Sequence, residues 1–236
     1  MKPIFWIIPA AAMAATSGCI ITDGPTESRT YANTGFDHVS ASSGINVVVS
    51  QGPFAVTVQA PEGKLDSVTI EQEGSELKVG RKSEISWFGW STGRYEVRVS
   101  APAYARISAS GGADVEGSAL QGEALSLSAS GGGDVDLSGL RITTLTASSS
   151  GGGDINVAGA CTTAAIDASG GGDFNGKSLD CANVKADASG GGDIEVRASA
   201  SADGRASSGG DVRFIGAPAT FTKDESSGGD VSLEAP

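Results

Sequence analysis

Seven aspartates at nearly constant spacing are the residues of this chain best placed to do chemistry. Each ends the motif Ser-Gly-Gly-Gly-Asp or a close variant of it, and the seven are Asp114, Asp134, Asp154, Asp173, Asp193, Asp211 and Asp230. Successive aspartates are separated by 18 to 20 residues. A repeat of this length is typical of a solenoid, in which each repeat forms one coil that stacks on the previous coil. The carboxylates are therefore predicted to form a column with a spacing of about 5 Å.

A column of carboxylates needs something that offsets the repulsion between neighbours. Two unit charges about 5 Å apart repel by about 3 kcal/mol at an effective dielectric constant of 20. Backbone N–H groups of the glycine corner could bind the carboxylates, as in Asx turns. Calcium could also bind them, because this ion takes oxygen ligands. The carboxylates could instead be catalytic, as in a polysaccharide-active enzyme. Glycoside hydrolysis uses two carboxyl groups, one of which has a raised pKa.

We favour a structural role for these aspartates. They are repeated, interchangeable and expected to face solvent, which does not resemble a tuned pair of acid and base. The chain also has a single histidine, His38, which leaves no partner for a multi-histidine metal site. We therefore predict a protein that is not an enzyme, with no catalytic residues, no metal ligands and no cofactor. A calcium-stabilised binding module and a polysaccharide-active β-helix enzyme remain as alternatives.

The glycine two positions before each aspartate occurs in all seven repeats. These glycines are Gly112, Gly132, Gly152, Gly171, Gly191, Gly209 and Gly228. The positions on either side of this glycine are less uniform, since Ala113, Ser208 and Ser227 replace glycine there. The uniform position is thus the best candidate for a positive φ, which glycine adopts at little cost. We predict that these glycines and the seven aspartates form structural turns.

The residues around each corner alternate in polarity with period two, as in a β-strand. The residue after each aspartate is always apolar, as in Val135 and Ile155, and the next one is mostly polar. A second alternating stretch precedes the glycines, for example Leu125, Leu127 and Ala129. Parallel crossovers are almost always right-handed. We therefore predict an all-β chain with a right-handed parallel β-helix of about seven short coils over residues 107–236.

Residues 36–106 lack the repeat and are predicted to form an antiparallel β-hairpin region. Residues 45–49 and 55–58 alternate on either side of a Gln-Gly-Pro turn, and residues 68–70 and 77–79 flank a Glu-Gly-Ser turn. Between them, Trp87, Phe88 and Trp90 lie close together. We expect these aromatic side chains to fill a core or cover the end of the solenoid, with an exposed binding tip as the alternative.

The N-terminus has the pattern of an export signal. Lys2 is followed by an apolar run over residues 4–15, which is too short to span a bilayer, and then by small residues and Cys19. This order resembles a bacterial lipoprotein signal, in which the cysteine is lipidated. We predict a signal peptide over residues 1–18, lipidation at Cys19 and a lipidated tether over residues 19–35. An ordinary cleaved signal with an incidental Cys19 is the alternative.

Cys161 and Cys181 each lie 12 residues before a repeat aspartate, so they share a register in adjacent coils. Adjacent coils are about 4.8 Å apart, which falls within the range of Cα–Cα distances for a disulfide. Export makes oxidation plausible. We predict a Cys161–Cys181 disulfide, with two free thiols as the alternative.

The charge of the chain is acidic, with a formal net charge of −12. Most of the excess lies in residues 107–236, which contain 18 acidic and seven basic side chains. Nucleic acid is therefore not an expected partner, because binding phosphate needs basic side chains.

The segment Ser43-Gly44-Ile45-Asn46-Val47, followed downstream by the Gly-Asp repeats, resembles the family described as "putative autotransporter adhesin, head GIN domain". The resemblance covers most of residues 36–232. It implies a β-helical exported domain, often lipid-anchored, with no established catalytic residues. We therefore expect a cell-envelope lipoprotein, in the outer membrane, that serves surface binding, adhesion or scaffolding. Its expected partners are the membrane, through the lipid anchor, and an unidentified envelope protein or glycan. The oligomeric state stays open.

Overall fold

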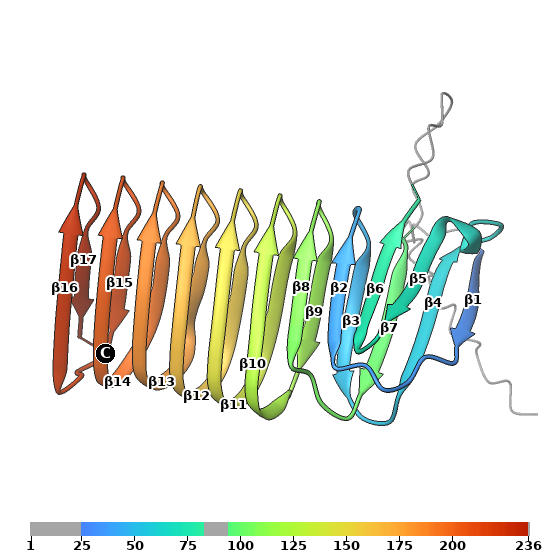
Figure 1. The fold of residues 1–236 in the computed structure, drawn as a ribbon, viewed down its shortest axis with the longest axis horizontal. Helices are drawn as coiled ribbons and strands as arrows, with labels where there is room; N and C mark the ends of the chain where they lie inside the picture. The colour runs from blue at the N-terminus through green and yellow to red at the C-terminus, as the bar shows by residue number, and fades with distance from the viewer. Residues whose placement is uncertain (1–24, 83–93, 236) are drawn as a thin grey trace, which may run out of the picture.

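The computed structural model describes residues 25–82 and 94–235, which are almost entirely β-structure (Figure 1). The predicted signal peptide, Cys19 and the aromatic cluster of Trp87, Phe88 and Trp90 lie outside the described residues. No helix in the described part of the chain is long and apolar enough to cross a membrane. The elements of the N-terminal half are β1 (Thr26–Tyr31), β2 (His38–Ser42), β3 (Asn46–Gln51), β4 (Ala55–Pro61), the 3₁₀ turn η1 (Leu65–Ser67), β5 (Val68–Glu73), β6 (Glu76–Arg81), β7 (Glu96–Ala101), β8 (Arg106–Ser110) and β9 (Asp114–Ser118).

The C-terminal half is a solenoid in which strands rise on one side and descend on the other (Figure 1). Its strands are β10 (Gln121–Ser130), β11 (Asp134–Ser150), β12 (Ile155–Ser169), β13 (Phe174–Ser189), β14 (Ile194–Ser207), β15 (Val212–Ile215), β16 (Thr220–Ser226) and β17 (Val231–Glu234). Each glycine corner joins a strand that enters it, the incoming strand, to one that leaves it, the outgoing strand. The longer strands β11 to β14 serve as the outgoing strand of one coil and the incoming strand of the next.

All neighbouring strands of the solenoid pair in parallel. The register matches the repeat, since Asp134 lies opposite Asp114 and Val135 lies opposite Ile155. In Figure 1 the chain rises along the near side, descends along the far side and advances from right to left, which is a right-handed winding. The predicted all-β fold with a right-handed parallel β-helix is confirmed.

The solenoid begins earlier than the repeat indicates, because β2 and β3 form a coil of the same kind. β2 pairs in parallel with β8, and β3 pairs in parallel with β9. Asn46 lies opposite Asp114, so the Gly44-Ile45-Asn46 triplet occupies the place of the Gly-Gly-Asp corner. Ser43 and Gly44 have φ angles of 63° and 67°, close to those of Gly111 and Gly112 in the next coil.

The predicted hairpin between residues 45–49 and 55–58 is wrong. β3 pairs with β7 and β9, whereas β4 pairs antiparallel with β1 and β7. An alternating pattern fits a parallel and an antiparallel partner equally well, so the pattern could not choose between them. The second predicted hairpin, β5 with β6 across the Glu-Gly-Ser turn, is confirmed.

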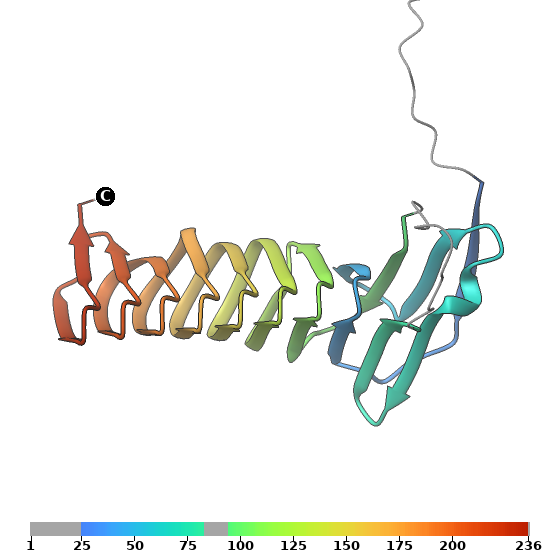
Figure 2. The same ribbon diagram turned by 90° about the horizontal axis from the view of Figure 1, so that it is seen from above.

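A curled sheet closes the N-terminal end of the solenoid (Figure 2). β6 and β7 pair in parallel with β2 and β3, and then β5, β4 and β1 add to them in antiparallel fashion. Phe36, Leu65, Val68 and Tyr95 are buried in this part. β1 falls within residues 19–35, which the sequence analysis assigned to a tether, so residues 26–31 belong to the sheet instead. The sequence of β1 is polar and shows no strand pattern. β1 pairs with the edge of β4, and Arg29 of β1 forms an ion pair with Asp66 at 2.9 Å.

One apolar core runs through the interior of the coils, as the alternation predicts. The residues that directly follow the corner aspartates are all buried: Val115, Val135, Ile155, Phe174, Ile194, Val212 and Val231. Small residues make room for the larger rings. A Cβ atom on Gly176 would lie 2.8 Å from Cε1 of Phe174, and one on Gly204 would lie 2.7 Å from Cε2 of Phe214. The core is therefore continuous although its coils are short.

The C-terminal coil carries charged side chains at positions where the other coils have core residues. Lys223 and Glu225 occupy positions opposite the buried Gly204 and Ala206, but both are exposed and form an ion pair at 2.8 Å. Glu225 also accepts a hydrogen bond from the backbone N–H of Val231, at 2.8 Å. The bond to Lys223 and this second bond lower the pKa of the Glu225 carboxyl. Charges at inward positions of a terminal strand discourage the addition of further strands.

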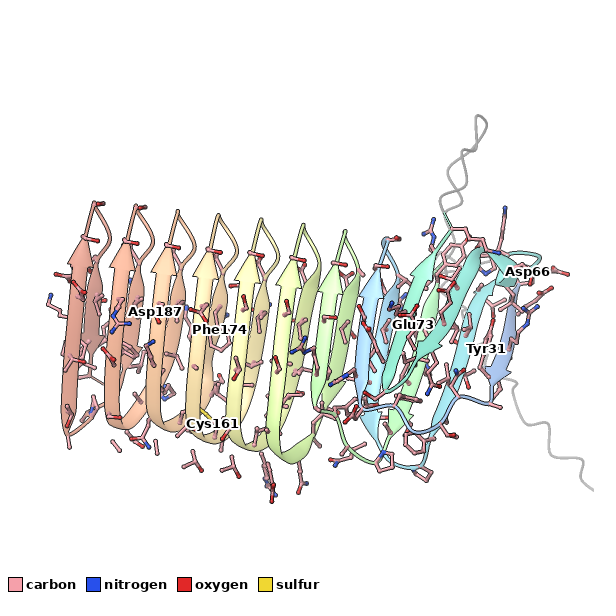
Figure 3. All side chains as sticks on the ribbon, in the orientation of Figure 1. Tyr31, Asp66, Glu73, Cys161, Phe174 and Asp187 are labelled. Atoms are coloured by element: carbon pink, nitrogen blue, oxygen red, sulfur yellow. A yellow bond between two sulfur atoms is a disulfide. The ribbon has the colours of Figure 1, made fainter. Side chains whose placement is uncertain are left out.

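A disulfide joins Cys161 of β12 to Cys181 of β13 (Figure 3). The two residues lie directly opposite each other in the parallel register, with a Cα–Cα distance of 4.5 Å. The bridge connects two adjacent coils at the end opposite the glycine corners.

Replacing both cysteines by alanine should lower the free energy of unfolding by about 3 kcal/mol, because the bridge closes a loop of 20 residues in the unfolded chain. Urea denaturation of the oxidised wild type and of Cys161→Ala/Cys181→Ala measures this difference. Reduced wild type is the control and should approach the variant. Equal midpoints for oxidised and reduced wild type would contradict the prediction.

Candidate functional site

Each glycine corner is a β-turn with two residues in the left-handed region. In the second repeat, the N–H of Gly133 donates a hydrogen bond to the carbonyl of Ser130 at 3.1 Å. Gly131 and Gly132 between them have φ angles of 57° and 76°. Positive φ at both central residues is the pattern of a type I′ turn, which favours glycine at these positions.

The glycine two positions before each repeat aspartate has a positive φ in every corner, between 75° at Gly112 and 86° at Gly228. The residue before it is also left-handed, even where it is Ser208 or Ser227, with φ angles of 55° and 51°. The sequence analysis did not anticipate this second position, because serine occupies it in two copies.

The glycine directly before the aspartate is constrained for another reason. A Cβ atom on Gly153 would lie 2.5 Å from the backbone nitrogen of Ser130 in the preceding coil, and similar contacts occur at Gly133 and Gly172. A Cβ atom on Gly152 would meet no atom within 4 Å. The corner therefore needs one glycine for its backbone angles and another for the close approach of two coils.

The aspartates bind backbone N–H groups of the next coil. Five aspartates, Asp134, Asp154, Asp173, Asp193 and Asp211, each accept a hydrogen bond at Oδ1 from the N–H of the following repeat aspartate, at 2.9 to 3.1 Å. Backbone N–H groups thus bind these carboxylates, but the bonds link neighbouring coils, whereas we expected bonds within one corner. We call this series the aspartate ladder.

Asp114 lies outside the ladder, because the N–H of Asp134 donates to the carbonyl of Ala113 at 2.9 Å. The pKa of the Asp114 carboxyl is raised, first by burial and then by the negative charges of Asp134, Glu116 and Asp136. These four carboxylates occupy two adjacent coils, with Asp114 opposite Asp134 and Glu116 opposite Asp136.

The aspartates do not form a cation site of the usual kind in the described part of the chain. There, no three His, Cys, Asp or Glu side chains are arranged to hold a metal ion. Each ladder carboxylate has a backbone partner at Oδ1, and the calcium alternative rests on the sequence pattern alone.

A groove runs across the outgoing strands on their outer face. It has a volume of about 700 Å³ and extends from β3 over β9, β11 and β12 to β13. Its apolar lining comes from Val48, Val49, Gly117, Leu137, Val157 and Ala158, and its polar lining from Ser50, Glu116, Ser118, Asp136, Ser138, Asn156, Asn175, Lys177 and Ser178. A second hollow of about 350 Å³ shares Asn175 and Lys177 with it and continues to Ser232 on β17.

One end of the groove lies beside the places where the parallel register of β11, β12 and β13 is interrupted. Between β11 and β12 the register shifts after Leu137, and between β12 and β13 it shifts after Asn156. These irregularities lie at the looser corner of each coil, where the chain turns from outgoing to incoming strand. At the N-terminal end, the Tyr104 hydroxyl donates to the carbonyls of Ser50 and Val99 at 2.9 and 3.0 Å, which fixes the ends of β3 and β7.

The sequence analysis assigned the aspartates but missed the groove. Glu116, Asp136, Asn156 and Asn175 are all the second residue after a repeat aspartate, so the alternation indicates that they face outward. The hollow is lined by five neighbouring strands, so the alternation within one repeat does not indicate it.

A family model described as "putative auto-transporter adhesin, head GIN domain" matches residues 35–218. No curated protein matches the chain.

Several crystal structures share the fold. A putative adhesin from Bacteroides fragilis is 21% identical, with a TM-score of 0.81, and the match covers 89% of this chain and 97% of that one. A putative adhesin from Parabacteroides merdae is 17% identical, with a TM-score of 0.64 and coverage of 91% and 97%. A protein from Parabacteroides distasonis described as a putative lipid binding protein is 18% identical, with a TM-score of 0.63 and coverage of 91% and 98%.

Asp154→Ala should lower the free energy of unfolding by about 1 kcal/mol, because the N–H of Asp173 loses its acceptor. Asp154→Asn should have a much smaller effect, since the amide oxygen can accept the same bond without charge repulsion. Urea denaturation with and without 1 mM Ca²⁺ measures both. Equal losses for the two variants, or a wild-type gain with calcium that both variants lack, would contradict the role assigned to the ladder.

Gly153→Ala should destabilise the protein more than Gly152→Ala, although only Gly152 has a positive φ. The second change strains one backbone angle, at a cost of about 1 kcal/mol, whereas the first forces two coils apart. Thermal melting monitored by circular dichroism compares the two variants. A larger shift for Gly152→Ala would show that backbone angles, and not the approach of coils, limit the corner.

Proposed function

Because the chain belongs to the head GIN domain family, we propose that it is a non-enzymatic, exported binding module of the cell envelope. Its β-helix presents the groove of the outgoing strands to a surface ligand, as an adhesion-type module does. The groove is the observation that carries this proposal: it is hollow, crosses several coils and contains both apolar and polar side chains. Such mixed, concave surfaces are typical of binding sites.

The rigidity of the solenoid suits a binding role. The aspartate ladder links the corners of successive coils, and the disulfide between Cys161 and Cys181 links two coils at the opposite end. Side chains on such a frame keep their spacing, so little order has to be imposed when a ligand binds.

We further propose that the chain is a lipoprotein of the outer membrane, anchored through Cys19. The support is the sequence: Lys2, the apolar run over residues 4–15 and the small residues before Cys19. Thr26, where β1 begins, follows Cys19 by seven residues, which can span at most about 25 Å. The curled sheet would thus stay close to the membrane, with the last coil at the opposite end of the molecule (Figure 1).

The test uses the full chain produced in a Gram-negative host with an alkyne-tagged fatty acid. The wild type should incorporate the tag and sediment with outer membranes, and its cells should gain adhesion to at least one surface in a panel of immobilised glycans and proteins. Cys19→Ala should lose the tag and the membrane fraction, because the lipid bond needs this thiol.

Cys161→Ala/Cys181→Ala is the matched control and should keep the tag. An untagged wild type would refute the lipid anchor. A tagged protein whose cells adhere no better than cells with an empty vector would refute the adhesion role.

A further inference from the structure

We propose that the groove of the outgoing strands binds an extended polypeptide segment that carries lysine or arginine side chains. The inference rests on the proposed function, since it names the ligand class of the same surface. The charge, the dimensions and the chemistry of the groove support this ligand class.

The charge at one end of the groove is negative and is not neutralised within the described structure. Glu116 and Asp136 line the groove, and Asp114 and Asp134 lie beside them on the same two coils. No described lysine or arginine forms an ion pair with any of the four. Arg98, which lies opposite Val48 in the neighbouring strand, pairs with Glu96 at 2.7 Å.

Some acidic side chains elsewhere on the solenoid have cationic partners. Glu195 pairs with Lys177 at 2.9 Å, Asp180 pairs with Arg197 at 3.1 Å, and Asp187 pairs with Lys185 at 3.2 Å. The four carboxylates around the groove lack such a partner among the described residues, and they lie opposite one another in two pairs on adjacent strands, Asp114 with Asp134 and Glu116 with Asp136. Their mutual repulsion also contributes to the raised pKa of Asp114. A bound cation would relieve this repulsion, so the complementary partner is positively charged.

The dimensions of the groove fit a short extended chain. It crosses the outgoing strands β3, β9, β11, β12 and β13, which at about 4.8 Å between neighbours gives a length of about 19 Å. An extended polypeptide rises by about 3.3 Å per residue, so about six residues fill this length.

The chemistry of the lining favours a polypeptide over a glycan. Asn156, Asn175 and the serine hydroxyls can donate to and accept from peptide groups, while the partly exposed Val48 and Ala158 offer apolar contact. Sugar rings present apolar faces that stack on aromatic side chains, and none of the described residues that line the groove is aromatic.

The experiment measures binding of the fluorescein-labelled hexapeptide Lys-Val-Lys-Val-Lys-Val to the full chain, purified in a non-ionic detergent, by fluorescence anisotropy in 0.15 M salt. Saturable binding is expected. Glu116→Gln/Asp136→Asn should weaken it at least tenfold. Asp167→Asn/Asp224→Asn removes the same charge from the incoming strands, which lie outside the groove, and should weaken it less than twofold.

Ser138→Trp tests the groove separately from its charge, because Ser138 is exposed and lines it. This variant should also weaken binding at least tenfold. Melting temperatures by circular dichroism confirm that the variants are folded, as expected for changes at exposed positions.

Three results would overturn the inference: no saturable binding of the hexapeptide, equal losses in the two charge variants, or unchanged binding to Ser138→Trp. Preferential binding of chitohexaose that Ser138→Trp abolishes would assign the groove to a glycan. That result would leave the adhesion role standing while this inference fails. Conversely, hexapeptide binding with the expected losses in a chain that lacks the lipid tag would refute only the anchor.

Discussion

The contact between one glycine corner and the next is the constraint on which the rest of the structure depends. Parallel strands of a solenoid must keep one register over many coils, and a corner that slipped by one residue would turn apolar side chains outward. Two features prevent this slip. The glycine that directly precedes six of the seven aspartates allows the backbones of adjacent corners to approach closely, and the aspartate ladder adds a side-chain bond to the next backbone N–H. The column of aspartates brings like charges close together, but its hydrogen bonds to the next coil help to hold the coils in register.

The two corners of each coil, the glycine corner and the looser corner, have different roles. The glycine corners are tight and uniform, so that side of the molecule is regular. At the looser corners the register shifts, as it does after Leu137 and after Asn156. The groove lies on the outgoing strands beside these shifts, and its lining includes exposed polar side chains such as Glu116 and Ser138. The glycine corners therefore hold the coils in register, while the backbone of the looser corners is less regular. Loops on a rigid scaffold often carry binding residues.

The two ends of the solenoid are closed by different means. At the N-terminal end, β6 and β7 continue the parallel stack, and antiparallel strands then cover the core. At the C-terminal end, Lys223 and Glu225 place an ion pair where a further coil would need apolar side chains. Both devices protect strand edges from pairing with other chains.

The repeat by itself determined the parallel β-helix, the residues that point inward, and the common register of Cys161 and Cys181. These features follow from contacts between adjacent coils, and a period of about 20 residues makes such contacts visible in the sequence. Only the tertiary structure decided the place of β2 and β3, because Asn46 pairs with Asp114 across a long insertion that carries no repeat. It also decided that β3 and β4 do not pair, since alternation does not distinguish parallel from antiparallel partners. The groove, too, is lined by five neighbouring strands at once, so it is a property of the coils together and not of one coil's sequence.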